Sequence, residues 1–361
     1  MTKDIIFIDV KTLHNFMQDV FIGIGVPEED AKICSEILIK SDLRGIESHG
    51  VQRLKMYYDR VLGGIQNATT DFKIIKESET TALVDAGHGM GHVAAYHAMR
   101  LAIEKAQKYG TGAVAVKNST HYGIAGYYAQ MAINEGMIGL TLTNARPSIA
   151  PTFGVEPMLG TNPLTIGCPT DESFPFLIDC ATSITQRGKI EVLARTETPT
   201  PSGWVIKENG ETSTDTIAVL NELIEGTAAL LPLGGAGEIL GGHKGYGYGT
   251  AVEILAAALT GGPFMKDLTL AKGYKLGHFF LAINIESFLP LATFKKIAGE
   301  IVRGLRNSKK APGQTRIYTA GEKEYEMEKK RYQTGIPINP SIQQDILTMQ
   351  KELGLTEYSF E

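Results

Sequence analysis

Four side chains suited to binding an anion or moving a proton stand close together in the segment SDLRGIESHGVQRLKMYYDR: Ser48, His49, Arg53 and Tyr57. The spacing of Arg53 and Tyr57 places both on one face of a helix. Such a face can hold a carboxylate, because arginine offers a two-pronged donor, tyrosine and serine add neutral donors, and His49 can carry or orient a proton. The alternative is an exposed polar helix end with solvated charges, and the segment by itself leaves both interpretations open.

Ser48 also stands directly beside a histidine, which raises the question of a hydrolase. Adjacent side chains rarely make the nucleophile-to-base hydrogen bond that acyl transfer needs. The chain also lacks the motif G-x-S-x-G. We therefore expect no hydrolase chemistry at Ser48.

His121 lies in VKNSTHYGIAGYYA, directly after a predicted strand and before an apolar helix interrupted by glycine. The carboxyl end of a strand is where α/β proteins bind ligands. Because its pKa is naturally near neutrality, an imidazole there can take the proton of a hydroxyl group while hydride leaves the same carbon. A structural histidine at a helix cap is the equal alternative.

Two glycine-containing loops offer a place for a phosphate group. The loops are LGTNP and GGHKGYG, and the second combines glycines with Lys244 at the start of a predicted helix. Backbone N–H groups, the positive helix end and an ammonium group suit a pyrophosphate, and Asp179 can accept a hydrogen bond from a ribose hydroxyl. Glycine-rich helix starts without ligands are common, so this pattern alone does not decide between the two.

The turn GHGMGH looks like a dinucleotide fingerprint but departs from it. It follows a predicted strand and opens a helix, yet His92 stands where G-x-G-x-x-G needs a small residue. No acidic residue ends a second strand about twenty positions later, as that fingerprint requires. We predict a tight turn here rather than a Rossmann phosphate site.

Composition and charge narrow the class of protein. A net charge of -5 provides no basic stripe for nucleic acid, and the eight histidines show neither H-E-x-x-H nor a Cys/His cluster, so we expect no nucleic-acid partner and no metal. Three cysteines without metal-type spacing suit buried thiols in a reducing compartment. With no signal peptide and no apolar segment long enough for a bilayer, we expect a cytoplasmic protein without a membrane partner.

The order of predicted elements indicates an α/β fold. Helices are predicted within residues 9–45, with Asp9 as N-cap, and strands and helices then alternate from residue 80 to residue 145. Further along we predict a hairpin around Asn209-Gly210, a helix over 250–259, a strand at HFFLAINI, and helices over 290–308 and from Asn339-Pro340. The expected division is a discontinuous helical lobe, 1–75 with 300–361, and an α/β core, 76–299, with sub-lobes 76–140 plus 240–299, and 141–239.

Six motifs occur in order over nearly the whole chain: RGIESHGVQRLKMY, KNSTHYGIAGYYA, NARPSIAPTFGVEPMLGTNPLTI, IDCATSITQRGKI, GGHKGYGYG and HFFLAINIESF. Together they resemble the malate/L-lactate dehydrogenase family, whose members act on malate, lactate, sulfolactate, ureidoglycolate and diketogulonate. The resemblance implies a mixed-sheet NAD(P)-binding fold distinct from Rossmann. It also implies a homodimer with active sites near the subunit interface.

The same resemblance implies roles for individual residues. His121 is the expected acid/base, with His49 as the alternative proton donor and Ser48 beside them; Ser48, Arg53 and Tyr57 are the expected substrate contacts. The residues expected to line the cofactor are Asn144, Asp179, Cys180, Ala181, His243, Lys244, Gly321 and Glu322. The segment LPLGGAGEILGGHKGYG is longer than the family's LPLGGHKGYG, and TAGEKE lacks the proline that often precedes GE in relatives.

The expected reaction is reversible hydride transfer between NAD or NADP, with NAD favoured, and a small 2-hydroxy/2-oxo acid. Malate/oxaloacetate is the favoured pair, and its second carboxylate needs a further cation, for which Arg44, Arg146 and Arg187 are candidates. The alternatives are a reductase of another 2-oxo acid or of a cyclic imino acid, and a nucleotide-binding regulator without catalysis.

Overall fold

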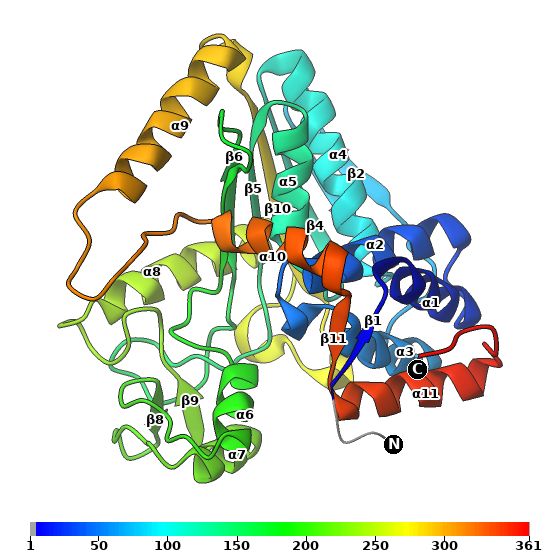
Figure 1. Ribbon diagram of the computed structural model, residues 1–361, viewed down its shortest axis with the longest axis vertical. Helices are drawn as coiled ribbons and strands as arrows, with labels where there is room; N and C mark the ends of the chain where they lie inside the picture. Colours follow the sequence, from blue (N-terminus) through cyan, green and yellow to red (C-terminus); the bar gives the residue numbers. More distant parts are fainter. Residues whose placement is uncertain (1–4, 361) are drawn as a thin grey trace.

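A seven-stranded mixed β-sheet forms the centre of the computed structural model, which describes residues 5–360 (Figure 1). In spatial order its strands are β2 (Lys73–Glu77), β3 (Thr81–Asp85), β4 (Thr111–Ser119), β10 (Leu276–Asn284), β5 (Met137–Thr143), β6 (Leu164–Cys168) and β7 (Phe176–Cys180). β3 and β4 are parallel, and β10 is antiparallel to both β4 and β5. Since β6 is antiparallel to β5 and β7, the strands β3, β4, β5 and β7 share one direction. Their carboxyl ends therefore meet at one edge of the sheet.

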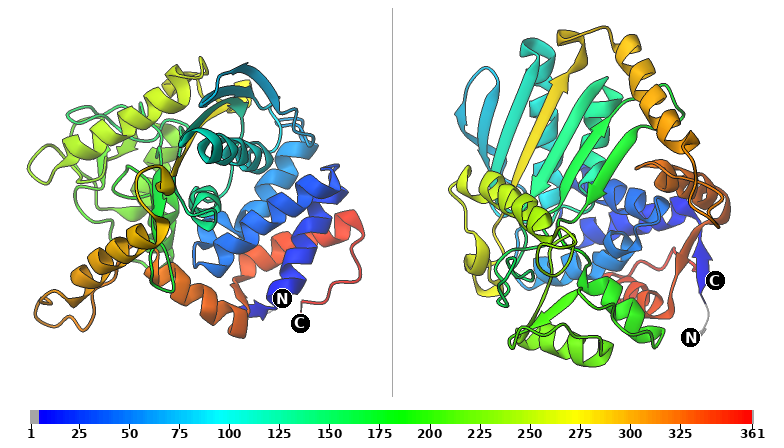
Figure 2. Two further views of the ribbon diagram at one scale, coloured as in Figure 1. Left: turned by 90° about the horizontal axis from the view of Figure 1, so that it is seen from above. Right: turned by 90° about the vertical axis from the view of Figure 1, so that its left-hand side faces the viewer.

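Helices cover both faces of this sheet (Figure 2). On one face lie α4 (Gly91–Tyr109) and α5 (Gly126–Asn134), and on the other lies α8 (Gly242–Glu253), which continues as a π-helical turn over Ile254–Ala258. The antiparallel β10 between β4 and β5 interrupts the all-parallel order of a Rossmann sheet. The predicted mixed-sheet, non-Rossmann α/β fold is thus confirmed.

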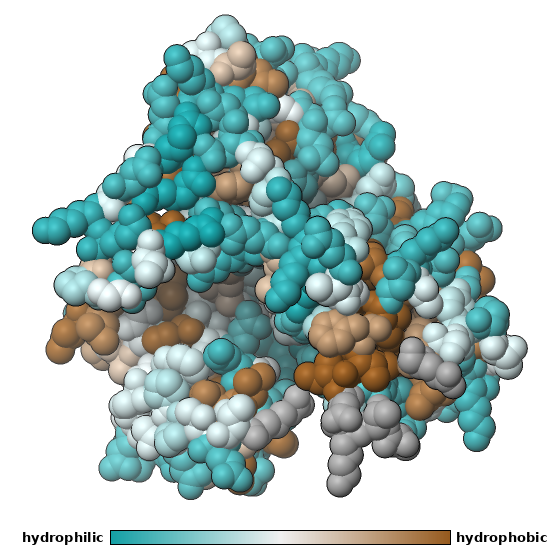
Figure 3. Space-filling view, viewed as in Figure 1, coloured by the Kyte–Doolittle hydropathy of each residue, from teal (hydrophilic) through white to brown (hydrophobic). Residues whose placement is uncertain are grey.

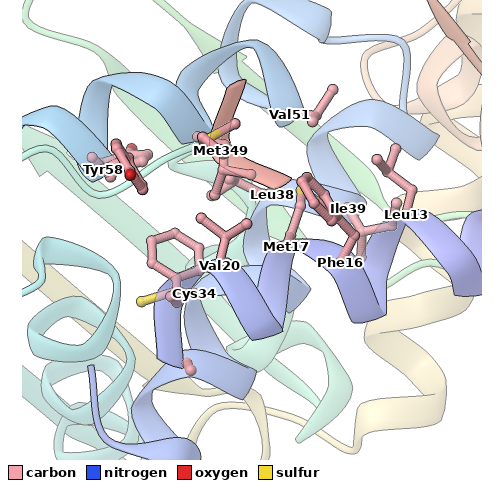
Figure 4. Packing of buried hydrophobic residues seen from close by; sticks show 14 of the residues in the cluster. Leu13, Phe16, Met17, Val20, Cys34, Leu38, Ile39, Val51, Tyr58 and Met349 are labelled. Atoms are coloured by element: carbon pink, nitrogen blue, oxygen red, sulfur yellow. The ribbon is translucent and has the colours of Figure 1, made fainter. Parts of the chain in front are cut away.

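A helical lobe packs beside the sheet and carries the segment that holds Arg53 and Tyr57. Its elements are α1 (Val10–Gly23), α2 (Glu28–Leu43), α3 (Leu54–Leu62), α10 (Glu322–Thr334), α11 (Pro340–Leu353) and the antiparallel pair β1 (Ile6–Ile8) and β11 (Ile336–Ile338). Phe16, Leu38 and Met349 from α1, α2 and α11 meet in one apolar core (Figure 4). We propose this lobe as the discontinuous domain, although the expected limits at 75 and 300 fall inside β2 and α9 (Leu291–Asn307).

A small lobe lies below the sheet in Figure 1 and has an apolar core of its own. It consists of α6 (Arg187–Arg195), β8 (Val205–Lys207), α7 (Thr216–Glu225) and β9 (Ala228–Leu230). The hairpin predicted around Asn209-Gly210 is only partly formed: Lys207 N–H donates to Glu211 O at 2.9 Å across the turn and Ile206 forms a bridge with Thr212, but the strand that pairs with β8 along its length is β9. The residues after the turn, ETSTD, are polar and have no apolar face to bury, whereas β9 is buried throughout.

The start of α8 also differs from the sequence prediction, which placed a helix only from residue 250. Glycines are poor helix formers, so propensity favoured a loop over the first eight residues of α8. In the structure a Cβ atom on Gly242 would overlap the carbonyl oxygen of Gly235, and one on Gly245 would overlap that of Leu233. The glycines are therefore required because the first turns of α8 pack directly on the preceding loop.

Local signals elsewhere were read correctly. Asp9 caps α1 by accepting a hydrogen bond from the backbone N–H of Thr12 at 3.0 Å, as its position before the helix predicts. The three cysteines are free thiols, but the prediction that they are buried holds only for Cys34, since Cys168 and Cys180 are partly exposed. Within residues 5–360, no helix combines the length and the apolar character needed to cross a membrane.

Candidate active site

The imidazole of His121 is held by a hydroxyl group from the helical lobe. His121 follows β4 at the carboxyl edge of the sheet, and Tyr57 is a fully buried residue of α3. The Tyr57 hydroxyl lies 2.6 Å from Nδ1 of His121, and it can donate to Nδ1 in one tautomer and accept from Nδ1–H in the other. Nε2 forms no hydrogen bond with any residue from 5 to 360, so this nitrogen is free for a substrate.

The surroundings of His121 keep its ring neutral. Burial lowers the pKa of His121 well below its usual value, and the neighbouring His49 ring and Arg53 guanidinium lower it further. A neutral imidazole is the form that accepts a proton. The same environment makes an anionic ligand favourable, because negative charge beside the ring would raise its pKa toward neutrality.

The His49 ring lies against the His121 ring, and Ser48 is bonded to His49. The rings of His49 and His121 stack with centroids 5.5 Å apart, and burial lowers the pKa of His49 to about 4. Our expectation that neighbouring Ser48 and His49 would not bond was wrong, since Ser48 Oγ lies 2.8 Å from His49 Nδ1. A hydrolase remains disfavoured, because His49 has no carboxylate partner among the described residues and so weak a base activates serine poorly.

Arg53 is oriented by its own backbone neighbourhood. Its Nε–H donates to the carbonyl oxygen of Ser48 at 2.6 Å, which leaves the two terminal N–H₂ groups for a planar anion. The preceding turn is fixed by Asp42, whose buried carboxyl accepts from the backbone N–H of Val51 at 2.8 Å. A Cβ atom on Gly50 would overlap that carboxyl, so this turn requires glycine.

The sheet topology brings half of the expected cofactor residues to the edge where His121 lies. Asn144 follows β5, and Asp179, Cys180 and Ala181 end β7 or follow it directly. The buried Asn144 side chain is committed to structure: its Oδ1 accepts from Gly277 N–H at 2.9 Å. The fold alone therefore accounts for an asparagine at this strand end, whether or not Asn144 also contacts a ligand.

The Asp179 carboxylate is likewise engaged within the chain. One carboxylate oxygen accepts a hydrogen bond from the backbone N–H of Gly126, in the first turn of α5, at 2.7 Å. The other oxygen accepts from Thr165 Oγ1 at 2.9 Å. Burial raises the pKa of Asp179, and these two hydrogen bonds oppose that rise. Its remaining lone pairs and the backbone of Cys180 and Ala181 are what a ribose would meet.

The other expected cofactor residues lie on two helix starts. His243 and Lys244 are exposed in the first turn of α8, and neither forms an ion pair with a described residue. Gly321 caps α10 beside the beginning of β7, with the nearby Leu177 N–H donating to Ala320 O at 3.3 Å. The Glu322 carboxylate is nearly fully buried and bonded to Arg316 and to the Thr319 N–H, and its own backbone N–H donates to Thr319 O at 3.2 Å, so both groups are used within the chain.

The turn GHGMGH is the predicted tight turn, and its N–H groups are used by the protein itself. Met90 N–H donates to Thr70 Oγ1 at 3.0 Å, and Gly91 N–H donates to Thr120 Oγ1 at 2.9 Å. A Cβ atom on Gly91 would overlap the backbone carbonyl of Thr120, next to His121. The glycine therefore allows α4 to pack against the strand end that carries His121.

Sequence reasoning overlooked two residues of this cluster. His92 is fully buried and its ring packs against Tyr57 with centroids 4.7 Å apart, whereas the sequence pattern favoured a surface loop at this position. Arg60 follows Arg53 by seven residues, and this helical spacing could have pointed to it. After the effect of burial, the guanidinium of Arg60 is among the groups that lower the pKa of His121.

The three arginines considered for a second carboxylate lie in different surroundings. Arg187 forms an ion pair with Glu191 on α6 at 3.1 Å. Burial raises the pKa of Asp179, and Arg44 lies near enough to that carboxyl to lower its pKa. Arg146 lowers the pKa of Arg60. Among the described residues no group of His, Cys, Asp and Glu side chains is arranged to hold a metal ion.

Comparison with known proteins agrees with this arrangement. Residues 8–347 match the family model described as malate/L-lactate dehydrogenase. The chain belongs to this family.

Several relatives resemble the chain over nearly its full length. A malate dehydrogenase of Pyrococcus abyssi is 48% identical over 345 residues, covering 95% of this chain and 94% of that protein. An L-sulfolactate dehydrogenase of Methanocaldococcus jannaschii is 38% identical, with 93% and 94% covered. The crystal structure of malate dehydrogenase from Entamoeba histolytica superposes with a TM-score of 0.94 at 44% identity, covering 97% of this chain and 99% of that one. As a family member, the chain is a hydroxy-acid dehydrogenase that uses a nicotinamide cofactor.

Proposed function

We propose that this dehydrogenase interconverts malate and oxaloacetate with NAD as the preferred cofactor. The observation that carries the proposal is the convergence of His121, Tyr57 and Arg53, an acid/base held by a buried hydroxyl beside a guanidinium with two free N–H₂ groups. The malate dehydrogenase names of the relatives from Pyrococcus abyssi and Pyrococcus horikoshii, 48% and 45% identical, support malate over the other substrates.

In the proposed mechanism the terminal N–H₂ groups of Arg53 bind the C1 carboxylate and so orient C2. Nε2 of His121 takes the hydroxyl proton as malate is oxidised, and Tyr57 accepts from the Nδ1–H that faces it. In the reverse direction the imidazolium returns this proton to the oxygen of oxaloacetate. A bound nicotinamide supplies the hydride acceptor or donor. Ser48 and His49 complete the wall beside the reacting oxygen, with His49 as the alternative donor.

The described residues fit a dinucleotide lying along the carboxyl edge of the sheet. Asn144, Cys180 and Ala181 would line its path through backbone and partly exposed side chains, and Gly321 and Glu322 would lie at its far end. The unpaired Lys244 and His243 at the start of α8 provide positive charge for the pyrophosphate. Asp179 at the end of β7 favours NAD, because a carboxylate near a ribose repels the 2′-phosphate of NADP.

We also propose a cytoplasmic homodimer, with no nucleic-acid or membrane partner. Support for a subunit contact comes from large apolar side chains on the loop before α8 and beside it: Phe153, Ile239 and Leu240 are 80%, 98% and 81% exposed. Brown atoms gather at this end of α8 in Figure 3. Exposed apolar groups of this size commonly mark protein contacts.

The test is absorbance at 340 nm with purified protein, NADH or NADPH, and a panel of 2-oxo and imino acids. We expect the fastest oxidation of NADH with oxaloacetate. Faster turnover of pyruvate, sulfopyruvate, oxalurate or a cyclic imino acid would replace malate by that substrate class. If no compound of the panel is reduced, although cofactor binding is demonstrated separately, the result would favour a nucleotide-binding regulator without catalysis.

A further inference from the structure

One face of α3 carries a third functional side chain beyond Arg53 and Tyr57. Arg60 follows Tyr57 by three residues and Arg53 by seven, so the three side chains project from the same side of the helix. Tyr57 fixes the position of this face, because its hydroxyl is bonded to His121. The guanidinium of Arg60 lies over the ring of Tyr274, with Cζ 5.6 Å from the ring centroid, which holds the side chain in place.

Arg60 is half-buried in a region of positive potential. Burial lowers the pKa of its guanidinium; Tyr57 and Tyr274 oppose this effect, and the charges of Arg53 and Arg146 reinforce it. Arg60 in turn is among the charges that lower the pKa of His121. The three guanidinium groups and the acid/base therefore share one electrostatic environment.

These arginines lack the carboxylate partners that most arginines of this chain have. Within residues 5–360, the arginines that form ion pairs are Arg100, Arg187, Arg303, Arg306, Arg316 and Arg331. Arg53, Arg60 and Arg146 form none with any described residue. Neighbouring like charges without a counter-ion destabilise a protein, and a dianionic ligand would neutralise them.

We propose that Arg60 binds the second anionic group of the substrate, while Arg53 binds the C1 carboxylate. Seven residues of helix separate Arg53 and Arg60 by about 10 Å along the axis, which suits two anionic groups of one small molecule better than a single carboxylate. The site would then select 2-oxo acids that bear a second carboxylate or a sulfonate over those with one anionic group. This inference rests on the proposed function and names the residue that sets its substrate class.

The kinetic test compares oxaloacetate with pyruvate as substrates of wild type and of Arg60→Gln. We expect the substitution to lower kcat/KM for oxaloacetate about 100-fold, the size typical of one lost charge-assisted hydrogen bond, and to change kcat/KM for pyruvate less than about threefold. Arg60→Lys should recover part of the loss. Arg53→Gln should lower kcat/KM for both substrates together. Arg100→Gln, which removes an exposed ion pair on α4, is the matched control. Equal losses for the two substrates, or no loss for oxaloacetate, would overturn the role of Arg60.

A binding measurement separates failure of this inference from failure of the proposed reaction. Oxaloacetate and pyruvate are titrated calorimetrically into protein saturated with oxidised cofactor, where no hydride is present and turnover cannot occur. Arg60→Gln should weaken oxaloacetate binding about 100-fold and leave pyruvate binding within about threefold, whether or not either compound is reduced by wild type. Unchanged oxaloacetate affinity, or wild-type protein that binds the two acids equally, contradicts the proposal. Sulfopyruvate in the same titration shows whether the second group read by Arg60 is a carboxylate, a sulfonate or both.

Discussion

The hydroxyl of Tyr57 and Nδ1 of His121 lie 2.6 Å apart, although 64 residues separate them in the chain. The contact joins the helical lobe to the sheet at the imidazole that we propose as the acid/base, because Tyr57 belongs to α3 and His121 follows β4. A hydroxyl partner remains neutral during the reaction, unlike the carboxylate that often orients a catalytic histidine. The basicity of His121 should therefore depend strongly on the charge of the bound substrate.

Tyr57→Phe should impair the proton transfer and leave the fold intact. Without the hydroxyl, the Nδ1–H of the imidazolium has no acceptor, so we expect kcat to fall about 10- to 100-fold and the pH at half-maximal kcat to move. A pH profile of kcat measures both effects. Tyr58→Phe is the control, because it removes a hydrogen bond to Glu352 on the lobe surface and should change stability without changing the profile. Identical profiles for the two variants would show that Tyr57 does not act through His121.

Replacement of the two candidate proton donors should separate their roles. Losing an acid/base costs about 100-fold or more, so His121→Asn should lower kcat by at least this factor. His49→Asn should have a smaller effect, because the buried Tyr57 hydroxyl orients the ring of His121 and not that of His49. Steady-state kinetics with oxaloacetate and malate provide the comparison. The reverse order of effects would assign the proton to His49.

Asp42 should make stability fall as the pH rises from about 4 to about 8. Burial raises the pKa of its carboxyl from 3.8 to about 8, so between these values the folded protein keeps a proton that the unfolded chain releases. The stabilisation is complete below pH 3.8 and is lost as the pH rises to about 8, at roughly 1.4 kcal/mol per pH unit. Asp42→Asn keeps an acceptor for the Val51 N–H and removes this slope. In urea denaturation from pH 5 to 8, the free energy of unfolding of the variant should rise relative to that of wild type. Parallel dependences on pH would contradict the raised pKa.

The buried histidines should limit stability in acid. Burial lowers the pKa of His92 and His278 to about 3, so the folded state keeps both rings neutral while the unfolded chain binds protons below pH 6.5. The stability they contribute is present above pH 6.5 and is lost as the pH falls toward 3, at about 1.4 kcal/mol per pH unit for each ring. His92→Phe should halve the part of the pH dependence of the unfolding free energy that His92 and His278 cause, measured by urea denaturation between pH 4.5 and 6.5. An unchanged slope would show that His92 is protonated in the folded protein.

The sequence predicted local features well because their causes are local. The cap at Asp9, the strands before His121 and Asn144 and the spacing of Arg53 and Tyr57 all follow from residues a few positions apart. The insertion of β10 between β4 and β5 depends on a segment more than a hundred residues away, and no periodicity encodes it. The commitment of Asn144 and Asp179 to backbone hydrogen bonds was also invisible, since their partners become neighbours only in the folded chain.

The pairing of β1 with β11 has a consequence for the order of folding during synthesis. The segment with Ser48, Arg53 and Tyr57 leaves the ribosome early, but its lobe is completed only when β11 and α11 emerge hundreds of residues later. Until then the apolar sides of α1 and α2 lack part of their packing, so the nascent chain presents them to chaperones or to other chains. The face of α3 that carries Tyr57 is thus completed only after β11 and α11 have been synthesised.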